Sequence, residues 1–126
     1  MANATSSQTL IDGVKNVVMK LTFLGDGSGE EAAVLKVDVS ALNGAPTRVR
    51  IMRVHYSVAG MVATLLWDAT TDVRILDLQG DHTLDFTYFG GLYNNAGAGI
   101  TGDIMLTTTG AGAADSYSII LEMIKD

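Results

Sequence analysis

The sequence predicts an all-β domain, an antiparallel β-sandwich of the jelly-roll type with roughly eight or nine strands. Apolar residues alternate with polar residues through most of the chain, as they do in strands that bury one face. Glycine, asparagine and aspartate recur every ~10 residues between these segments, where they favour turns. The best helical candidate, residues 6–14, is too short and contains Gly13. The pattern therefore favours short strands throughout.

The first two predicted strands follow this two-residue period closely. Residues 15–24 form the first, and the glycine-rich turn at 25–29 ends it. Residues 31–39 repeat the pattern before a loop at 42–46, which contains the one proline of the chain. The apolar face of the first strand consists of Val17, Met19, Leu21 and Phe23.

The next predicted strand, residues 47–59, contains a change of phase. Its apolar residues have odd numbers before Met52 and even numbers after Arg53. One extra residue at this point, a β-bulge, would place both groups on the same face. We expect Gly60 to end the strand. The two groups are Val49 and Ile51, then Val54, Tyr56 and Val58.

The remaining predicted strands are residues 62–68, 72–78, 82–89, 103–109 and 115–125. The first two form a hairpin through a turn at 69–71. In the third, His82, Leu84, Phe86 and Tyr88 alternate with polar residues. A glycine-rich irregular segment, 90–102, precedes the fourth. The predicted organisation is a polar arm over residues 1–9, followed by one domain over residues 10–126.

The composition excludes several classes of protein. A net charge of −6 argues against binding to nucleic-acid backbones, which requires clustered lysine and arginine. The absence of cysteine excludes disulfides and thiolate metal sites. No apolar run approaches the ~20 residues of a membrane helix, and the polar start does not resemble a signal peptide. We expect no contact with nucleic acid or membrane.

No group of residues predicts catalysis or a cofactor. His55 and His82 each lie within a predicted strand, without a second ligand at metal-binding spacing. Residues 26–31 resemble the first half of a calcium loop but lack its distal glutamate. Segment 90–102 lacks the Gly-Lys-Ser/Thr of a phosphate-binding loop. We therefore expect no catalytic residue, no metal and no cofactor.

Two features instead predict contacts with other chains. Charged residues make up 17% of the sequence, against ~25% in a typical soluble domain. Some strands are also apolar on the face opposite the core, where Val18, Leu24, Ile120 and Ile124 lie. Serine, threonine, asparagine and glycine could supply a polar surface instead. The interface candidates are Leu92, Tyr93, Asn94 and Asn95 in the long loop, Arg48 and Arg50 on one strand face, and Ile120 and Ile124.

Several segments resemble the small β-sandwich virion structural proteins of tailed bacteriophages. They are the strand 49–58 with His55-Tyr56, the hairpin segment 65–68, the run 88–92, the entry 102–104 and the start of the last strand at 115–117. The resemblance implies a non-enzymatic head decoration (cement) protein, a trimer bound to the major capsid protein over subunit junctions. It implies assembly into virions in the host bacterial cytoplasm. A neck or tail adaptor, a fibre component and a receptor- or glycan-binding module are the alternatives.

Overall fold

The computed structural model describes residues 4–27, 31–97 and 99–125, and over these ranges the chain is all-β. The predicted fold class is confirmed. The elements are β1 (Ala4–Asp12), β2 (Asn16–Asp26), β3 (Val34–Val37), the 3₁₀ helix η1 (Val39–Ala41), β4 (Val49–Trp67), β5 (Val73–Asp85), the 3₁₀ helix η2 (Thr87–Phe89), β6 (Ile104–Thr109) and β7 (Ala113–Lys125). None of these residues forms a helix long and apolar enough to cross a membrane.

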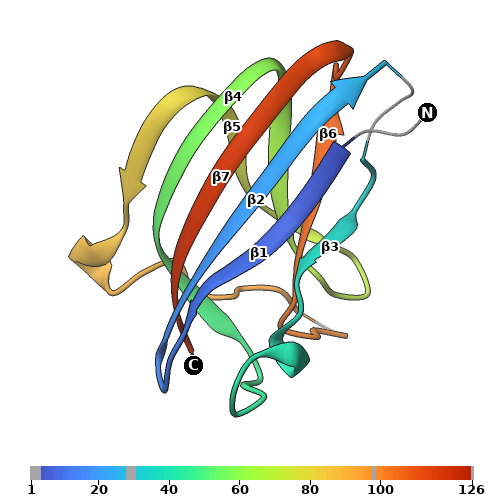
Figure 1. The fold of residues 1–126 in the computed structure, drawn as a ribbon. Helices are drawn as coiled ribbons and strands as arrows, with labels where there is room; N and C mark the ends of the chain where they lie inside the picture. Colours follow the sequence, from blue (N-terminus) through green and yellow to red (C-terminus); the bar gives the residue numbers. More distant parts are fainter. Residues whose placement is uncertain (1–3, 28–30, 98, 126) are drawn as a thin grey trace.

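The strands form one antiparallel sheet that curves round until its two halves face each other (Figure 1). The front layer has the order β1-β2-β7-β4-β5 and uses the first half of β4 with the second half of β5. The back layer has the order β5-β4-β6-β3 and uses the other halves. β7, the last strand in the chain, therefore lies in the middle of the front layer.

The predicted number of strands was wrong, because the described residues form seven. Gly60 and Gly80, expected at strand ends, are corners inside β4 and β5, with φ angles of 78° and 80°. Gly80 pairs with Val58, and the ladder resumes at Ala63. Glycine adopts this left-handed conformation without steric cost, so each strand turns from one layer to the other without ending.

β1 occupies much of the predicted polar arm. Residues 4–9 pair antiparallel with β2, and the strand continues to Asp12. The Asp12 carboxylate accepts hydrogen bonds from the backbone N–H of Asn43, at 2.9 Å, and from Lys125 Nζ, at 2.7 Å. The boundary expected after residue 9 therefore lies within a strand. Residues 1–3 lie outside the described ranges.

The β-bulge in β4 is confirmed. The register of β4 against β7 shifts between Ile51 and Arg53, and Met52 is the extra residue. Val49 and Val54, on opposite sides of the shift, are both completely buried. The core lies between the two layers, and its largest buried side chains are Trp67, Tyr117, Leu21, Ile51, Leu65, Leu78, Ile104 and Leu106.

Candidate functional site

The outer face of the front layer presents three rows of side chains across five strands. Each row follows the register, so neighbours in a row are directly paired residues. The rows are Ile11–Val18–Glu122–Arg53–Asp85, Gln8–Lys20–Ile120–His55–Thr83 and Ser6–Thr22–Ser118–Ser57–Asp81. The first row is apolar at the β1 end and charged at the β5 end. The third row is almost entirely hydroxyl-bearing.

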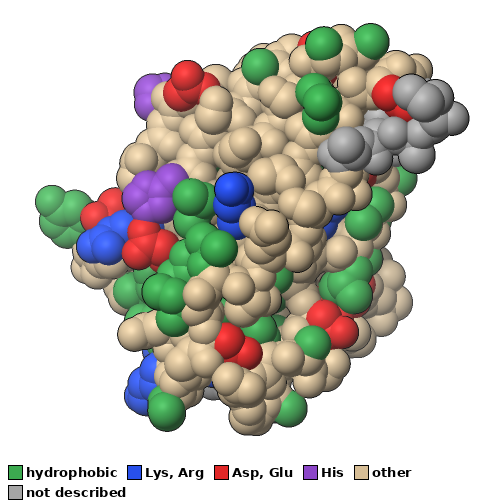
Figure 2. Space-filling model, in the orientation of Figure 1, with side chains coloured by type: hydrophobic (Ala, Val, Ile, Leu, Met, Phe, Trp, Pro, Cys, Tyr) green, Lys and Arg blue, Asp and Glu red, His purple; other side chains and the backbone are tan. Residues whose placement is uncertain are grey.

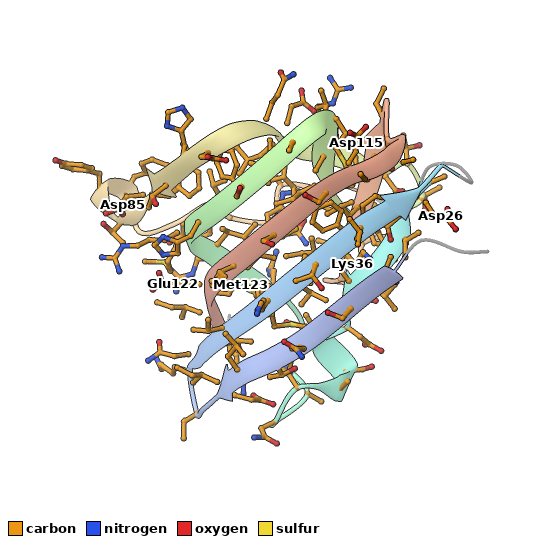
Figure 3. All side chains as sticks on the ribbon, turned by 45° about the horizontal axis from the view of Figure 1, so that its top comes forward. Asp26, Lys36, Asp85, Asp115, Glu122 and Met123 are labelled. Atoms are coloured by element: carbon orange, nitrogen blue, oxygen red, sulfur yellow. The ribbon has the colours of Figure 1, made fainter. Side chains whose placement is uncertain are left out.

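The charged end of these rows holds a compact ionic cluster. Arg53 Nε lies 3.4 Å from Asp85 Oδ2, and Arg53 Nη1 lies 3.5 Å from Glu122 Oε1. His55 Nε2 contacts the other carboxylate oxygen of Glu122. Figure 3 labels Glu122 on β7 and Asp85 at the end of β5. The side chains are between 32% and 44% exposed, so the cluster contributes little to the stability of the fold.

The apolar end of the first row forms the wall of a groove of about 340 Å³. We call it the outer groove. Its lining consists of Ile11, Asn16, Val18, Met52, Arg53, Thr87, Glu122, Met123 and Ile124. Figure 2 shows hydrophobic side chains gathered on this face, beside a group of histidine, basic and acidic side chains. A largely apolar hollow with both signs of charge on its rim is typical of a protein-contact site.

An exposed aromatic turn stands at the edge of the outer groove. Thr87 lines the groove and begins η2, which also contains Tyr88 and Phe89. Tyr88 is 97% exposed and Phe89 is 61% exposed. The predicted strand 82–89 therefore ends early, at Asp85. The expectation that Tyr88 continues the alternation was wrong, because the chain leaves the sheet after Asp85 and turns through Gly90, at a φ of 82°.

The structure brings Arg50 and Tyr93, two predicted interface residues, into direct contact. The Arg50 guanidinium lies over the Tyr93 ring, 4.8 Å from its centre, and Nη1 donates a hydrogen bond to the hydroxyl at 2.9 Å. Leu92 exchanges backbone hydrogen bonds with Ile51 and is half-buried. Arg48 is exposed. The contacts with Arg50 and the backbone bonds of Leu92 therefore fix the position of the Tyr93 side chain.

The other predicted residues divide between surface and interior. Asn95 is exposed, but Asn94 is only 7% exposed and accepts a hydrogen bond from the backbone of Ala96. Asn94 is therefore not available as a surface contact. Ile120 and Ile124 lie on the outer face as expected, both partly exposed. Tyr93 and Asn95 line a smaller hollow of about 220 Å³ with Trp67.

Sequence reasoning missed the aromatic turn and the groove beside it. One local signal was available, because Asp85 and Thr87 have the spacing of an aspartate-initiated turn. The Asp85 side chain accepts hydrogen bonds from the Thr87 N–H, at 2.9 Å, and from its hydroxyl, at 2.6 Å. These bonds, together with Arg53, hold the pKa of Asp85 below its ordinary value of 3.8. The groove itself has no sequence signature, because its lining comes from five separate segments.

A second polar group lies inside the fold. Glu31 and Lys36 form an ion pair at 2.6 Å whose side chains are only 8% and 4% exposed. The Tyr117 hydroxyl donates to the other Glu31 oxygen at 2.6 Å, and the Glu31 N–H donates to Thr108 Oγ1. Burial, followed by the adjacent Glu31 carboxylate, raises the pKa of Tyr117 well above 10. This cluster is a buried structural network.

The two histidines do not meet at a common ligand position. His55 contacts Glu122 and Thr83, whereas the His82 ring packs edge-on against Tyr56, with ring centres 6.2 Å apart. Within residues 4–27, 31–97 and 99–125, no group of three or more His, Cys, Asp or Glu side chains is arranged to hold a metal. Residues 26–31, which resemble the first half of a calcium loop, lie partly outside these ranges.

The fold and the surface together define an all-β domain whose front layer carries exposed apolar and charged side chains on its outer face. The sequence matches no protein-family model and no curated protein. Among solved structures it is similar to a cupin domain from Bordetella pertussis, with 11% sequence identity and a TM-score of 0.42. That similarity covers 100% of this chain and 98% of the cupin chain.

Proposed function

We propose that this chain is a non-enzymatic structural protein of a bacteriophage particle. The function proposed is that of a capsid decoration (cement) protein that binds over junctions between capsid subunits as a homo-oligomer, with a trimer expected. The observation that supports it is the number of large apolar side chains left at the surface, among them Tyr88, Phe89, Tyr93 and Ile11. Of these, Ile11 lines the outer groove, and Tyr88 and Phe89 directly follow Thr87, which lines the same groove. Exposed apolar side chains around one hollow mark interaction sites.

The proposed mechanism is burial of this surface against neighbouring chains. Apolar area removed from water contributes about 25 cal/mol per Å². A standard interface of ~1,600 Å² therefore has a large gross driving force, although lost freedom of motion offsets much of it. Bound over a junction, such a protein would make separation of the capsid subunits less favourable.

The composition of purified phage particles tests the proposal. The particles are those of the phage that encodes the chain, and the measurement is quantitative mass spectrometry of this chain and the major capsid protein. A fixed ratio that follows the major capsid protein is the expected result. A few copies per particle would replace decoration with a neck, tail or fibre role. Absence from the particle would overturn the virion assignment.

Glycan binding is the second candidate, and the hollow beside Tyr93 supports it. Tyr93 is 56% exposed, and Asn95 and Arg74 line the same hollow. An exposed aromatic ring with amide and guanidinium donors nearby can stack on a sugar and hydrogen-bond its hydroxyls. On a glycan array, binding by the intact chain that Tyr93→Ala abolishes would favour this role. An array without signal for the intact chain removes it.

A further inference from the structure

The turn between η1 and β4 ties together the ends of two strands that are far apart in the sequence. The Asn43 N–H donates to Asp12 Oδ2 at 2.9 Å, and Asn43 Nδ2 donates to Asp12 O, also at 2.9 Å. Lys125 Nζ donates to Asp12 Oδ1 at 2.7 Å, and to the backbone oxygens of Gly13 and Asn43 at 2.6 and 2.7 Å. We call Asp12, Asn43 and Lys125 the clasp. It anchors the end of β1 and the end of β7 to the same turn.

The turn requires glycine directly after Asn43. The Ala45 N–H donates to Leu42 O at 2.9 Å and closes the turn, in which Gly44 has a φ of 79°. Glycine adopts this left-handed conformation freely, whereas other residues rarely do. Asn43 supplies the two donors that Asp12 accepts. The pair Asn43-Gly44 therefore follows from the turn and the clasp together.

Asparagine followed by glycine is also the pair in which the side-chain amide reacts most readily with the main chain. The Gly44 nitrogen attacks Asn43 Cγ, the new N–Cγ bond forms, and the Cγ–Nδ2 bond breaks. Ammonia leaves with the proton of the Gly44 N–H, and a cyclic imide remains. Water then opens the ring at either carbonyl, which gives aspartate or isoaspartate. Glycine has no Cβ, so it leaves the attacking nitrogen unhindered.

The surroundings of Asn43 permit this reaction. Asn43 and Gly44 are exposed, and a Cβ built on Gly44 would meet no atom within 4 Å. No hydrogen bond in the described part of the chain uses the Gly44 N–H. A hollow of about 400 Å³, lined by Asp12, Gly13, Val14, Asn43 and Gly44, adjoins the turn and admits water. The bond from Nδ2 to Asp12 O holds the amide in place, so the attack must await opening of the clasp.

Conversion of Asn43 would remove the contacts that make the clasp. The product carries an oxygen where Nδ2 now donates to the Asp12 carbonyl, and two acceptors cannot bond. It also adds a negative charge beside the Asp12 carboxylate. Lys125 and then Asn43 hold the pKa of this carboxylate below 3.8, so it is ionised at neutral pH. Isoaspartate also lengthens the main chain by one carbon, which displaces the backbone oxygen that Lys125 contacts.

We propose that Asn43 is a site of spontaneous deamidation, that the clasp sets its rate, and that conversion opens the clasp irreversibly. The end of β1 and the end of β7 then lose their common anchor. The change needs only water and releases only ammonia. It alters the protein with age wherever the chain acts, so it is independent of the proposed function.

Peptide mapping by mass spectrometry tests the site. The folded, intact chain is incubated in mildly alkaline buffer, which favours attack by the amide nitrogen. The peptide containing Asn43 should gain one dalton and become a substrate for isoaspartyl methyltransferase. Asn95 is the internal reference, because it is exposed in a loop but precedes alanine. Asn43 should convert several-fold faster than Asn95, and conversion at an equal or lower rate overturns the proposal.

A pair of lysine variants tests the role of the clasp. Lys125→Met removes the ammonium group at its centre and should raise the rate at Asn43 several-fold. Lys15→Met is the matched control, because it removes the same charge from an exposed position nearby, and it should leave the rate unchanged. An unchanged rate in Lys125→Met, or an equal rise in Lys15→Met, overturns the control by the clasp.

The intact chain unfolded in urea provides a second measurement that does not depend on the folding of Lys125→Met. Unfolding removes the clasp, so Asn43 should convert several-fold faster in urea than in the folded chain. Equal rates in the folded and unfolded chains would overturn the control by the clasp. Far-ultraviolet circular dichroism checks that both lysine variants fold.

Hydrogen–deuterium exchange tests the opening. Anion exchange separates the converted chain, which has one more negative charge, from the unconverted chain. Residues 10–12 should exchange several-fold faster after conversion, whereas β6 should be unchanged. Asn43→Asp adds the charge without the longer main chain, so it should show a smaller increase. Unchanged exchange at residues 10–12 in the converted chain overturns the opening of the clasp.

Discussion

The buried ion pair of Glu31 and Lys36 is the least expected residue-level feature, because charged side chains are seldom buried so completely. Each charge keeps its partner in a place where water does not reach, and Tyr117 supplies a further hydrogen bond to Glu31. Such a pair contributes little net stability, yet the loss of one member leaves an uncompensated charge. The pair therefore makes the fold sensitive to single substitutions.

Lys36→Met should lower the free energy of unfolding by about 3–5 kcal/mol, because it leaves the Glu31 carboxylate buried and unpaired. The double variant Glu31→Gln/Lys36→Met should recover much of that loss. Urea unfolding followed by the fluorescence of Trp67, the one tryptophan, measures both. A single variant as stable as the intact chain would contradict the prediction.

Asp103 provides a pH-dependent prediction. Burial, and then the negative charges of Asp38 and Asp68, raise its pKa above the ordinary 3.8. The folded state therefore holds this proton more tightly than the unfolded chain, and stability is lost as the pH rises through the raised pKa. Asp103→Asn removes the charge and keeps an acceptor for the Val39 N–H.

Asp103→Asn should therefore increase the free energy of unfolding at pH 7. The gain should shrink as the pH falls toward 3.8, where the intact carboxyl becomes protonated. Thermal melts across this pH range measure the difference. A gain independent of pH would show that another cause is responsible.

At the residue scale, the sequence identified side chains able to make contacts, but not which residues lie next to them in the fold. Arg50 and Tyr93 were both selected, yet their contact depends on how residues 90–93 fold back on β4. Tyr88 was assigned to a strand because alternation alone cannot show where a strand leaves its sheet. Asn94 was selected as an interface candidate because of its residue type, which does not show that its side chain is buried.

At the element scale, the corners at Gly60 and Gly80 determine the architecture. A Cβ on Gly80 would meet no atom within 4 Å, whereas a Cβ on Gly60 would lie 2.2 Å from Asp115 Oδ1. Asp115 also accepts a hydrogen bond from the Gly112 N–H at 2.8 Å. The same backbone conformation thus occurs in open space at one corner and against a fixed side chain at the other.

Gly80→Ala should destabilise the protein by about 1–2 kcal/mol, the cost of a left-handed conformation with a side chain. Gly60→Ala should destabilise it more, because Asp115 must also move. Adding Asp115→Ala to Gly60→Ala should restore part of the difference. Denaturant unfolding measures all three variants, and equal losses at the two glycines would contradict this account.

Strand existence was predictable and strand continuity was not. The two-residue period located β2, β4, β6 and β7, and the change of phase located the bulge at Met52. β1 lacks the period, since most of its residues are small and polar, and only its pairing with β2 makes it a strand. The glycine corners look like strand ends in sequence because both require positive φ.

At the scale of the whole molecule, β4 and β5 belong to both layers. Neither layer can unfold alone without breaking the two strands that it shares with the other. We therefore expect a single cooperative transition. Trp67 fluorescence, which reports the back layer, and far-ultraviolet circular dichroism, which reports the whole sheet, should give the same midpoint. Two separate midpoints would show that the layers are independent.

The central place of β7 has a consequence for synthesis on the ribosome. β2 and β4 emerge early, but the strand that joins them is the last of the seven to be translated. Until it arrives, both present open hydrogen-bonding edges and apolar faces, which invite pairing with other nascent chains. The front layer can therefore close only after β7 has been translated, and a high rate of expression should favour aggregation over folding.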